Sequence, residues 1–174
     1  MDRVLRIARR IGASPQRVFD AWIDADIARR WLFATAWRPL ASATIDARVG
    51  GAFELVDERH GRCVAYRGEY LEIDPHRHLA FTLSLDTSVV TRVTVDIARA
   101  ARASRVALTH ECVPPRKAAE MRARWIGILY GLDATLAAPP ALPQNFDEAR
   151  CRFRPVRIDH EERRLPFPTI RSER

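Results

Sequence analysis

Apolar and polar residues alternate along several segments of this chain, and the alternation predicts strands that each bury one face. Between Arg3 and Ile11, the residues Leu5, Ile7 and Ile11 share one side, while arginine recurs on the other. Arg9 breaks the apolar row, so we expect it near an end of the sheet. The same reasoning predicts six more strands, at residues 42–49, 52–57, 63–73, 78–85, 89–98 and 104–112. Turn signals separate these six at roughly ten-residue spacing, which is typical of an antiparallel meander.

Helical spacing of apolar residues predicts three helices. Ser14-Pro15 marks the first start, because serine caps helices well and proline suits their first position. Asp24 predicts the cap of a second, short helix that ends near Trp31. A long helix is predicted from about Arg116 to Ala137, between two proline pairs. Its apolar stripe consists of Ala118, Met121, Trp125, Ile128, Leu129, Leu132 and Leu136.

The order of the predicted elements indicates the fold. The adjacent Gly50 and Gly51 predict a two-residue hairpin turn, where a positive φ favours glycine. A strand, two short helices, six strands and a long helix predict a curved seven-stranded antiparallel sheet. Only the last helix is long enough to cross its concave side, since about 21 residues at 1.5 Å each span roughly 30 Å. We therefore predict an α+β fold in which the sheet wraps around the C-terminal helix.

Composition excludes several classes of protein. The chain has 174 residues, of which 47% are hydrophobic and 29% charged, as in a soluble globular domain. No apolar run approaches the roughly 20 residues that span a bilayer, and the first residues lack the apolar core of a secretory signal. The three cysteines show no CxxC spacing, which indicates reduced thiols rather than a disulfide frame or zinc site. We expect a cytoplasmic protein that does not bind membranes.

The net charge of +7 and the pI near 10.3 raise the question of nucleic-acid binding. Lys117 is the only lysine among the 29 basic residues, so arginine supplies all the others. Such a ratio is typical of a GC-rich genome, and the arginines are interleaved with acids along most of the chain. We therefore expect no nucleic-acid partner.

Five segments together resemble a known family. They are ASPQRVFDAWIDADIARRW, RVGGAFEL, GEYLEIDPHRHLAFTLSL, SRVALTHE and RARWIGILYGL. The chain resembles, over about residues 3 to 137, bacterial relatives of the activator-of-Hsp90-ATPase C-terminal domain. This family belongs to the START-like or Bet v 1-like helix-grip group, which also includes polyketide cyclases. The resemblance implies one helix-grip domain at residues 1–138, and we expect residues 139–174 to form an irregular extension.

The apolar rows of sheet and helix predict either a solid core or a lined pocket, and the resemblance favours the pocket. His110 shares a strand face with Val106 and Leu108, so it is the best candidate to orient a ligand or move a proton. The alternative is a histidine bonded to backbone or water. Tyr66 and Tyr70 either offer hydroxyl groups to a ligand or pack within the sheet. The predicted cavity lining is Trp31, Phe33, Phe53, Leu55, Tyr66, Tyr70, Phe81, Leu83, Leu108, His110, Met121, Trp125, Ile128 and Leu129.

No strong catalytic motif accompanies this lining. The sequence has no GxSxG elbow, no GxGxxG loop, no phosphate-binding GxxxxGK[ST] and no Cys/His set with zinc spacing. We predict no catalytic residue, no metal and no cofactor.

Three functions are compatible with these observations. A small hydrophobic ligand-binding module is favoured, because it needs a cavity and no catalytic group. An enzyme of the polyketide cyclase, aromatase or hydrolase kind would use the same cavity, with His110 or a tyrosine for proton transfer. Regulation of an Hsp90-type chaperone ATPase is implied by the resemblance alone. A homodimer is compatible with all three.

Overall fold

A computed structural model describes residues 3–34, 38–59, 61–85 and 89–137. The predicted extension at residues 139–174 lies outside these described residues. The elements are β1 (Arg3–Ile11), α1 (Pro15–Ile23), α2 (Ala25–Ala28), β2 (Ser42–Ile45), β3 (Ala52–Arg59), β4 (Arg62–Asp74), β5 (His78–Leu85), β6 (Thr91–Ala100), β7 (Ala103–Val113), a 3-10 turn η1 (Pro115–Lys117) and α3 (Ala118–Ala137).

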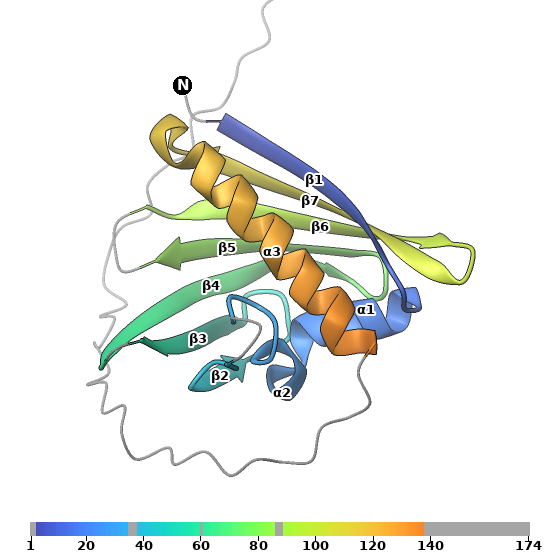
Figure 1. Cartoon of the computed structure of the whole chain (residues 1–174), viewed down its shortest axis with the longest axis horizontal. Coiled ribbons are helices and arrows are strands. Elements are labelled where there is room, and N and C mark those ends of the chain that lie inside the picture. Colours follow the sequence, from blue (N-terminus) through green and yellow to red (C-terminus); the bar gives the residue numbers. More distant parts are fainter. Residues whose placement is uncertain (1–2, 35–37, 60, 86–88, 138–174) are drawn as a thin grey trace, which may run out of the picture.

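The strands form one antiparallel sheet in the order β1-β7-β6-β5-β4-β3-β2, so β1 and β2 are its two edges. The sheet is curved, and α3 lies across its inner face with α1 and α2 near the C-terminal end of α3 (Figure 1). This arrangement confirms the predicted α+β helix-grip fold. The short helices carry the chain from one edge strand to the other, so the remaining strands can follow as a meander.

Side-chain caps start both short helices where the sequence predicts them. The hydroxyl of Ser14 accepts a hydrogen bond from the Arg17 amide at 3.4 Å, and the Asp24 carboxylate accepts one from the Ile27 amide at 3.0 Å. Each cap satisfies an amide that has no partner within its helix. The second helix, α2, ends at Ala28 and is shorter than predicted, because tight turns follow it through Trp31.

Contacts with the N-terminal elements hold the C-terminal half of α3. The Asp133 carboxylate accepts a hydrogen bond from the Gly12 amide at 2.9 Å and lies 3.4 Å from the Arg9 guanidinium. That guanidinium also lies 3.3 Å from the centre of the Tyr130 ring. Arg17 donates to the Leu136 carbonyl at 2.9 Å, which satisfies one of the last carbonyls of the helix. Arg9, which interrupts the apolar row of β1, therefore links that strand to α3.

The turn at Gly50 and Gly51 differs from the prediction. Strand β2 ends at Ile45, not Val49, and the two-residue turn is wrong because a longer loop joins β2 to β3. Gly50 has a φ of 78°, whereas Gly51 is not in the positive-φ region. The Gly50 amide donates to the Tyr70 carbonyl at 2.8 Å, and the Tyr70 amide donates to the Gly51 carbonyl at 2.9 Å. Gly51 therefore continues the pairing of β3 with β4, in which Ala52 is opposite Glu69.

Two bulges change which residues face inward. The register of β4 against β5 shifts between Tyr70 and Glu72, so Tyr70 is buried while Glu72 points out. On β7, two residues oppose one residue of β1, and Cys112 has a φ of 58°. Cys112 is consequently exposed and Val113 is 1% exposed. A bulge re-aims the side chains that follow it, which simple alternation along a strand cannot reveal.

A close approach of an aromatic ring explains Gly68 in the middle of β4. A Cβ atom at this position would lie 2.5 Å from the Phe53 ring and would also collide with the Thr82 carbonyl. The aromatic ring therefore packs directly on the β4 backbone. This contact belongs to a continuous core of buried residues from α1, α3 and most strands.

Candidate functional site

A pocket of about 210 Å³ lies where the N-terminal end of α3 meets the ends of β5, β6 and β7. Its lining combines apolar side chains, one histidine with a neighbouring threonine, and three basic residues. The lining residues are Phe33, Tyr66, Leu83, Leu85, Val89, Thr91, His110, Val113, Pro114, Arg116, Lys117, Met121 and Arg124.

The structure divides the predicted lining residues among three places. Phe33, Tyr66, Leu83, His110 and Met121 line the pocket of about 210 Å³. Phe53, Leu55, Tyr70 and Phe81, together with Phe33, line a second space of about 10 Å³, which is the size of a single water molecule. The residues buried elsewhere in the core are Trp31, Leu108, Trp125, Ile128 and Leu129.

His110 lies in a chain of hydrogen bonds that begins on α3 and ends on β5. The indole nitrogen of Trp125 donates to Nδ1 of His110 at 2.9 Å. Nε2 of His110 lies 2.8 Å from the Thr91 hydroxyl, which donates to the Leu83 carbonyl at 2.8 Å. Because the indole can only donate, Nδ1 is the acceptor, and neutral His110 carries its proton on Nε2. Thr91 therefore accepts from the histidine.

Burial keeps His110 neutral. The side chain is 1% exposed, and desolvation lowers the pKa of His110 to about 4. Both ring nitrogens already have partners, so a proton acceptor is not free in this arrangement. The hydroxyl oxygen of Thr91 keeps one unused lone pair at the pocket wall. The wall can therefore orient a ligand that donates a hydrogen bond.

Phe33 forms the partition between the pocket and the small second space, since it lines both. Its ring stacks on Tyr66 with centres 4.1 Å apart and an interplanar angle of 5°. Its ring centre is also 5.5 Å from that of Trp125. The φ of Phe33 is 61°, a left-handed conformation that costs free energy for a bulky residue. Phe33 and Tyr66 both line the pocket, so this stacked pair forms an apolar part of its wall.

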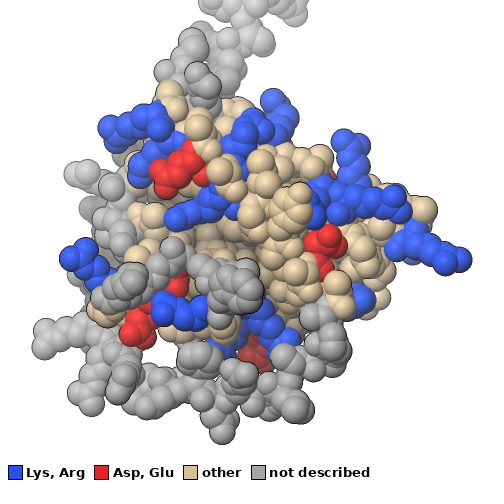
Figure 2. Space-filling model, viewed as in Figure 1, with Lys and Arg blue, Asp and Glu red and all other residues tan. Residues whose placement is uncertain are grey.

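Basic side chains occupy the rim of the pocket. Arg116 and Lys117 come from η1 and are exposed, whereas Arg124 is half-buried on α3. The Arg124 guanidinium donates to the Tyr66 hydroxyl at 3.4 Å and lies 5.9 Å from that ring's centre. On the face that carries α3, more basic than acidic surface is visible (Figure 2).

The sequence did not predict most of the residues at the rim of the pocket, nor Val113 and Pro114, which follow the bulge at Cys112. Thr91, Val113 and Arg116 lie at ends of strands or in turns, where periodicity carries no information. Arg124 follows Met121 by three positions, and this spacing places both on one side of a helix. This spacing was the one signal in the sequence that could have placed Arg124 at the pocket. Because Arg124 is charged, we did not assign it to the apolar stripe of the helix.

Metal-binding groups and membrane spans are both absent from the described residues. Among residues 3–34, 38–59, 61–85 and 89–137, no group of three or more His, Cys, Asp or Glu side chains could hold a metal ion. In the same part of the chain, no helix has both the length and the apolar content of a membrane span.

Comparison with known proteins supplies a family and a set of similar folds. Residues 12–137 match the family described as Activator of Hsp90 ATPase homolog 1-like protein. No curated protein matches the chain. Protein CV1439 from Chromobacterium violaceum is 24% identical with a TM-score of 0.67, and the match covers 75% of this chain and 95% of that one. CalU16 from Micromonospora echinospora is 20% identical with a TM-score of 0.62, and the match covers 78% of this chain and 77% of CalU16. DynU16, described as a putative protein in the dynemicin biosynthetic locus, is 18% identical with a TM-score of 0.65, covering 79% and 48%.

Proposed function

Because the chain belongs to the Activator of Hsp90 ATPase homolog 1-like family, we propose that it is a binding module for a small, mostly apolar molecule held between the sheet and α3. The observation that carries this proposal is the pocket of about 210 Å³, with its stacked Phe33–Tyr66 wall and its His110–Thr91 hydrogen-bond chain. Ligand pockets generally combine an apolar lining with a few fixed polar groups, and this pocket has that composition.

The size of the pocket restricts the ligand. Pockets for drug-sized molecules measure about 300–1,000 Å³, whereas an apolar cavity of about 150 Å³ accommodates benzene. The pocket of about 210 Å³ therefore suits a single aromatic ring with a short substituent, or a short alkyl chain. A longer ligand would extend outward past the exposed rim, because the second space behind Phe33 adds only about 10 Å³.

A pocket-filling substitution tests the proposal. We expect cinnamyl alcohol or a similar single-ring ligand to raise the melting temperature of the wild-type protein and to bind in calorimetry. Met121→Trp places an indole in the pocket and should abolish both effects. Ile126→Trp is the matched control, because Ile126 lies on the same helix and is 42% exposed. Equal binding by the two variants, or no binding by the wild type across a set of one-ring and short-chain compounds, would contradict the proposal.

An enzyme of the cyclase kind is the second candidate, and one observation favours it. His110 lines the pocket, so a bound ligand can come within hydrogen-bond reach of it, as proton transfer requires. The bond from Trp125 to Nδ1 and the low pKa of His110 weigh against a role as general base. The two candidates separate in heavy water, where NMR follows deuterium uptake at the α-carbon of a bound ketone. Uptake that the His110→Gln variant loses, with the ketone still bound, would favour the enzyme.

Regulation of an Hsp90-type chaperone rests on the family description alone. The measurement for it is the ATP turnover of a purified bacterial Hsp90 with and without this protein. An unchanged turnover at saturating protein would eliminate this alternative.

A further inference from the structure

Three cations and no carboxylate occur among the described residues that line the pocket. We infer that the ligand is a small organic monoanion, an aryl or short-chain carboxylate whose charged end lies at Arg116, Lys117 and Arg124. Its apolar body would lie on the Phe33–Tyr66 wall. This inference rests on the proposed function, since it names the chemical class that the same pocket binds.

The rim gathers three cations at one pocket. Some arginines elsewhere pair with acids, as in Arg67 with Glu54 and Arg92 with Glu72, both at 2.5 Å. Within the described part of the chain, no ion pair within 4.0 Å involves any of the three rim cations. Like charges gathered without counter-charges repel one another, and an anion among them removes that repulsion.

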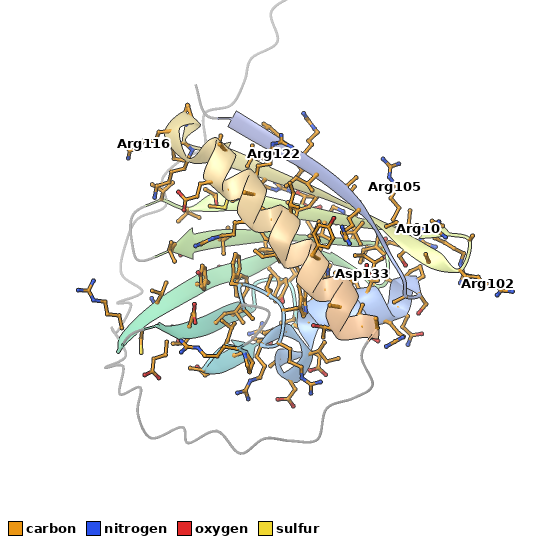
Figure 3. The ribbon with its side chains drawn as sticks, viewed as in Figure 1. Arg10, Arg102, Arg105, Arg116, Arg122 and Asp133 are labelled. Atoms are coloured by element: carbon orange, nitrogen blue, oxygen red, sulfur yellow. The ribbon has the colours of Figure 1, made fainter. Side chains whose placement is uncertain are left out.

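The helix adds to the positive potential. Arg116 and Lys117 lie in η1, directly before the first residue of α3, at the end of the helix where the dipole is positive. Acidic residues are usually favoured at such an end. The one acid in the first turn is Glu120, which is exposed and does not line the pocket. Figure 3 shows Arg116 beside this end of α3 and Asp133 near the opposite end.

The positive charge of Arg124 lies next to the aromatic wall of the pocket. Its guanidinium is held by the Tyr66 hydroxyl at 3.4 Å and lies over the ring that stacks on Phe33. A carboxylate at the rim can therefore meet a guanidinium while its attached ring contacts Tyr66. Bidentate pairing of a guanidinium with a carboxylate is among the strongest polar contacts available to a protein.

The interior fixes the direction of the ligand. Thr91 donates its hydroxyl proton to the Leu83 carbonyl and accepts from His110, so it presents only a lone pair to the pocket. A carboxylate pointed inward would face this lone pair, which is unfavourable. A carboxylate pointed outward meets the cations, and the inner end of the ligand can carry a hydroxyl group that donates to Thr91.

Matched pairs of probes test this inference apart from the proposed function. Calorimetry at low salt would compare benzoate with benzamide, 3-phenylpropionate with 3-phenylpropanamide, and octanoate with octanamide. We expect at least one carboxylate to bind about tenfold or more tightly than its amide. The preference should shrink when salt is raised, since screening weakens a charged contact at a partly exposed rim. Acetate serves as a control for an anion site that needs no apolar body.

Substitutions locate the charge recognition. Lys117→Gln and Arg124→Gln should each reduce carboxylate affinity by about fivefold or more and leave amide affinity unchanged. Arg105→Gln is the matched control, because Arg105 lies on β7 opposite Arg10 of β1 and does not line the pocket. Thermal melts establish that each variant is folded, and the salt dependence of the wild type provides a second readout without any variant.

The outcomes separate the two proposals. Equal affinities of carboxylates and amides, with binding retained, would overturn the anion inference and leave the binding module standing. Acetate binding as tightly as 3-phenylpropionate would also overturn it, because the apolar body would then contribute nothing. Failure of every probe to bind would remove both the inference and the proposed function.

Discussion

The two halves of α3 grip the sheet in different ways. Toward its C-terminus the helix packs against α1 and β1, with Leu132 fully buried and Asp133 bonded to the Gly12 amide. Toward its N-terminus it covers a pocket with a basic rim, and Met121 is only half-buried. The C-terminal half, which we call the closed half, has paired charges. The N-terminal half, which we call the open half, has cations that form no ion pair among the described residues. The same helix thus packs tightly against the sheet at one end and borders a pocket at the other.

Truncating one residue in each half of α3 gives the largest expected contrast. Leu132→Ala should lower the free energy of unfolding by about 3–4 kcal/mol, because it leaves a void in a fully buried site. Met121→Ala should cost about 1 kcal/mol, since its side chain already borders empty space. Urea denaturation of both variants measures the contrast. Equal losses would mean that the N-terminal half of the helix is as tightly packed as the other.

Acid should act on the open half through His110. Its pKa is lowered to about 4 in the folded protein, against about 6.5 when unfolded, so the unfolded chain binds the proton more readily. The histidine is neutral at pH 7, and its contribution is lost as the pH falls from about 6.5 to 4. The expected loss is about 3 kcal/mol.

The measurement compares wild type and His110→Gln in urea at pH 7, 5.5 and 4.5. Carboxylate titration affects both proteins alike, so the difference between them isolates the histidine. We expect that difference to narrow as the pH falls. A difference that stays constant would show that the histidine is solvated or charged in the folded state.

Relieving the strain at the bulge is the smallest expected effect. Cys112→Gly should raise the free energy of unfolding by about 0.5–1 kcal/mol, because glycine adopts a φ near 58° without a steric cost. Cys63→Gly is the control: Cys63 lies within β4 and has no positive φ, so the same change should destabilise by about 1 kcal/mol. Thermal melts under reducing conditions suffice for both. A destabilised Cys112→Gly variant would place the origin of the bulge elsewhere.

The sequence was sufficient for the fold because its signals were local and consistent. Ser14-Pro15 and Asp24 mark helix starts, alternation marks the strands, and the stripe from Ala118 to Leu136 marks a long helix with one buried side. The resemblance to the Hsp90-activator family, read from five short segments, is confirmed by the family match over residues 12–137.

The site was harder to predict because it depends on departures from regularity. The bulge at Cys112 turns Val113 inward, and a one-residue shift of this kind leaves no mark in the alternation. The sequence could not decide whether large inward residues would fill the interior or surround a space. The ring centres of Phe53 and Phe81 are 5.5 Å apart, and the two residues border a space of only about 10 Å³. Leu83 and His110 instead border the pocket of about 210 Å³.

The place of β1 in the sheet governs how the domain can assemble. Within the described part of the chain, this edge strand pairs only with β7, from Ile11 with Ser104 to Arg3 with Val113. During synthesis β1 therefore cannot pair with β7 until about a hundred further residues have emerged from the ribosome. Contacts between such distant segments slow folding, since a long loop must close before they form. The sheet can therefore be completed only after the β6–β7 hairpin and α3 have been synthesised.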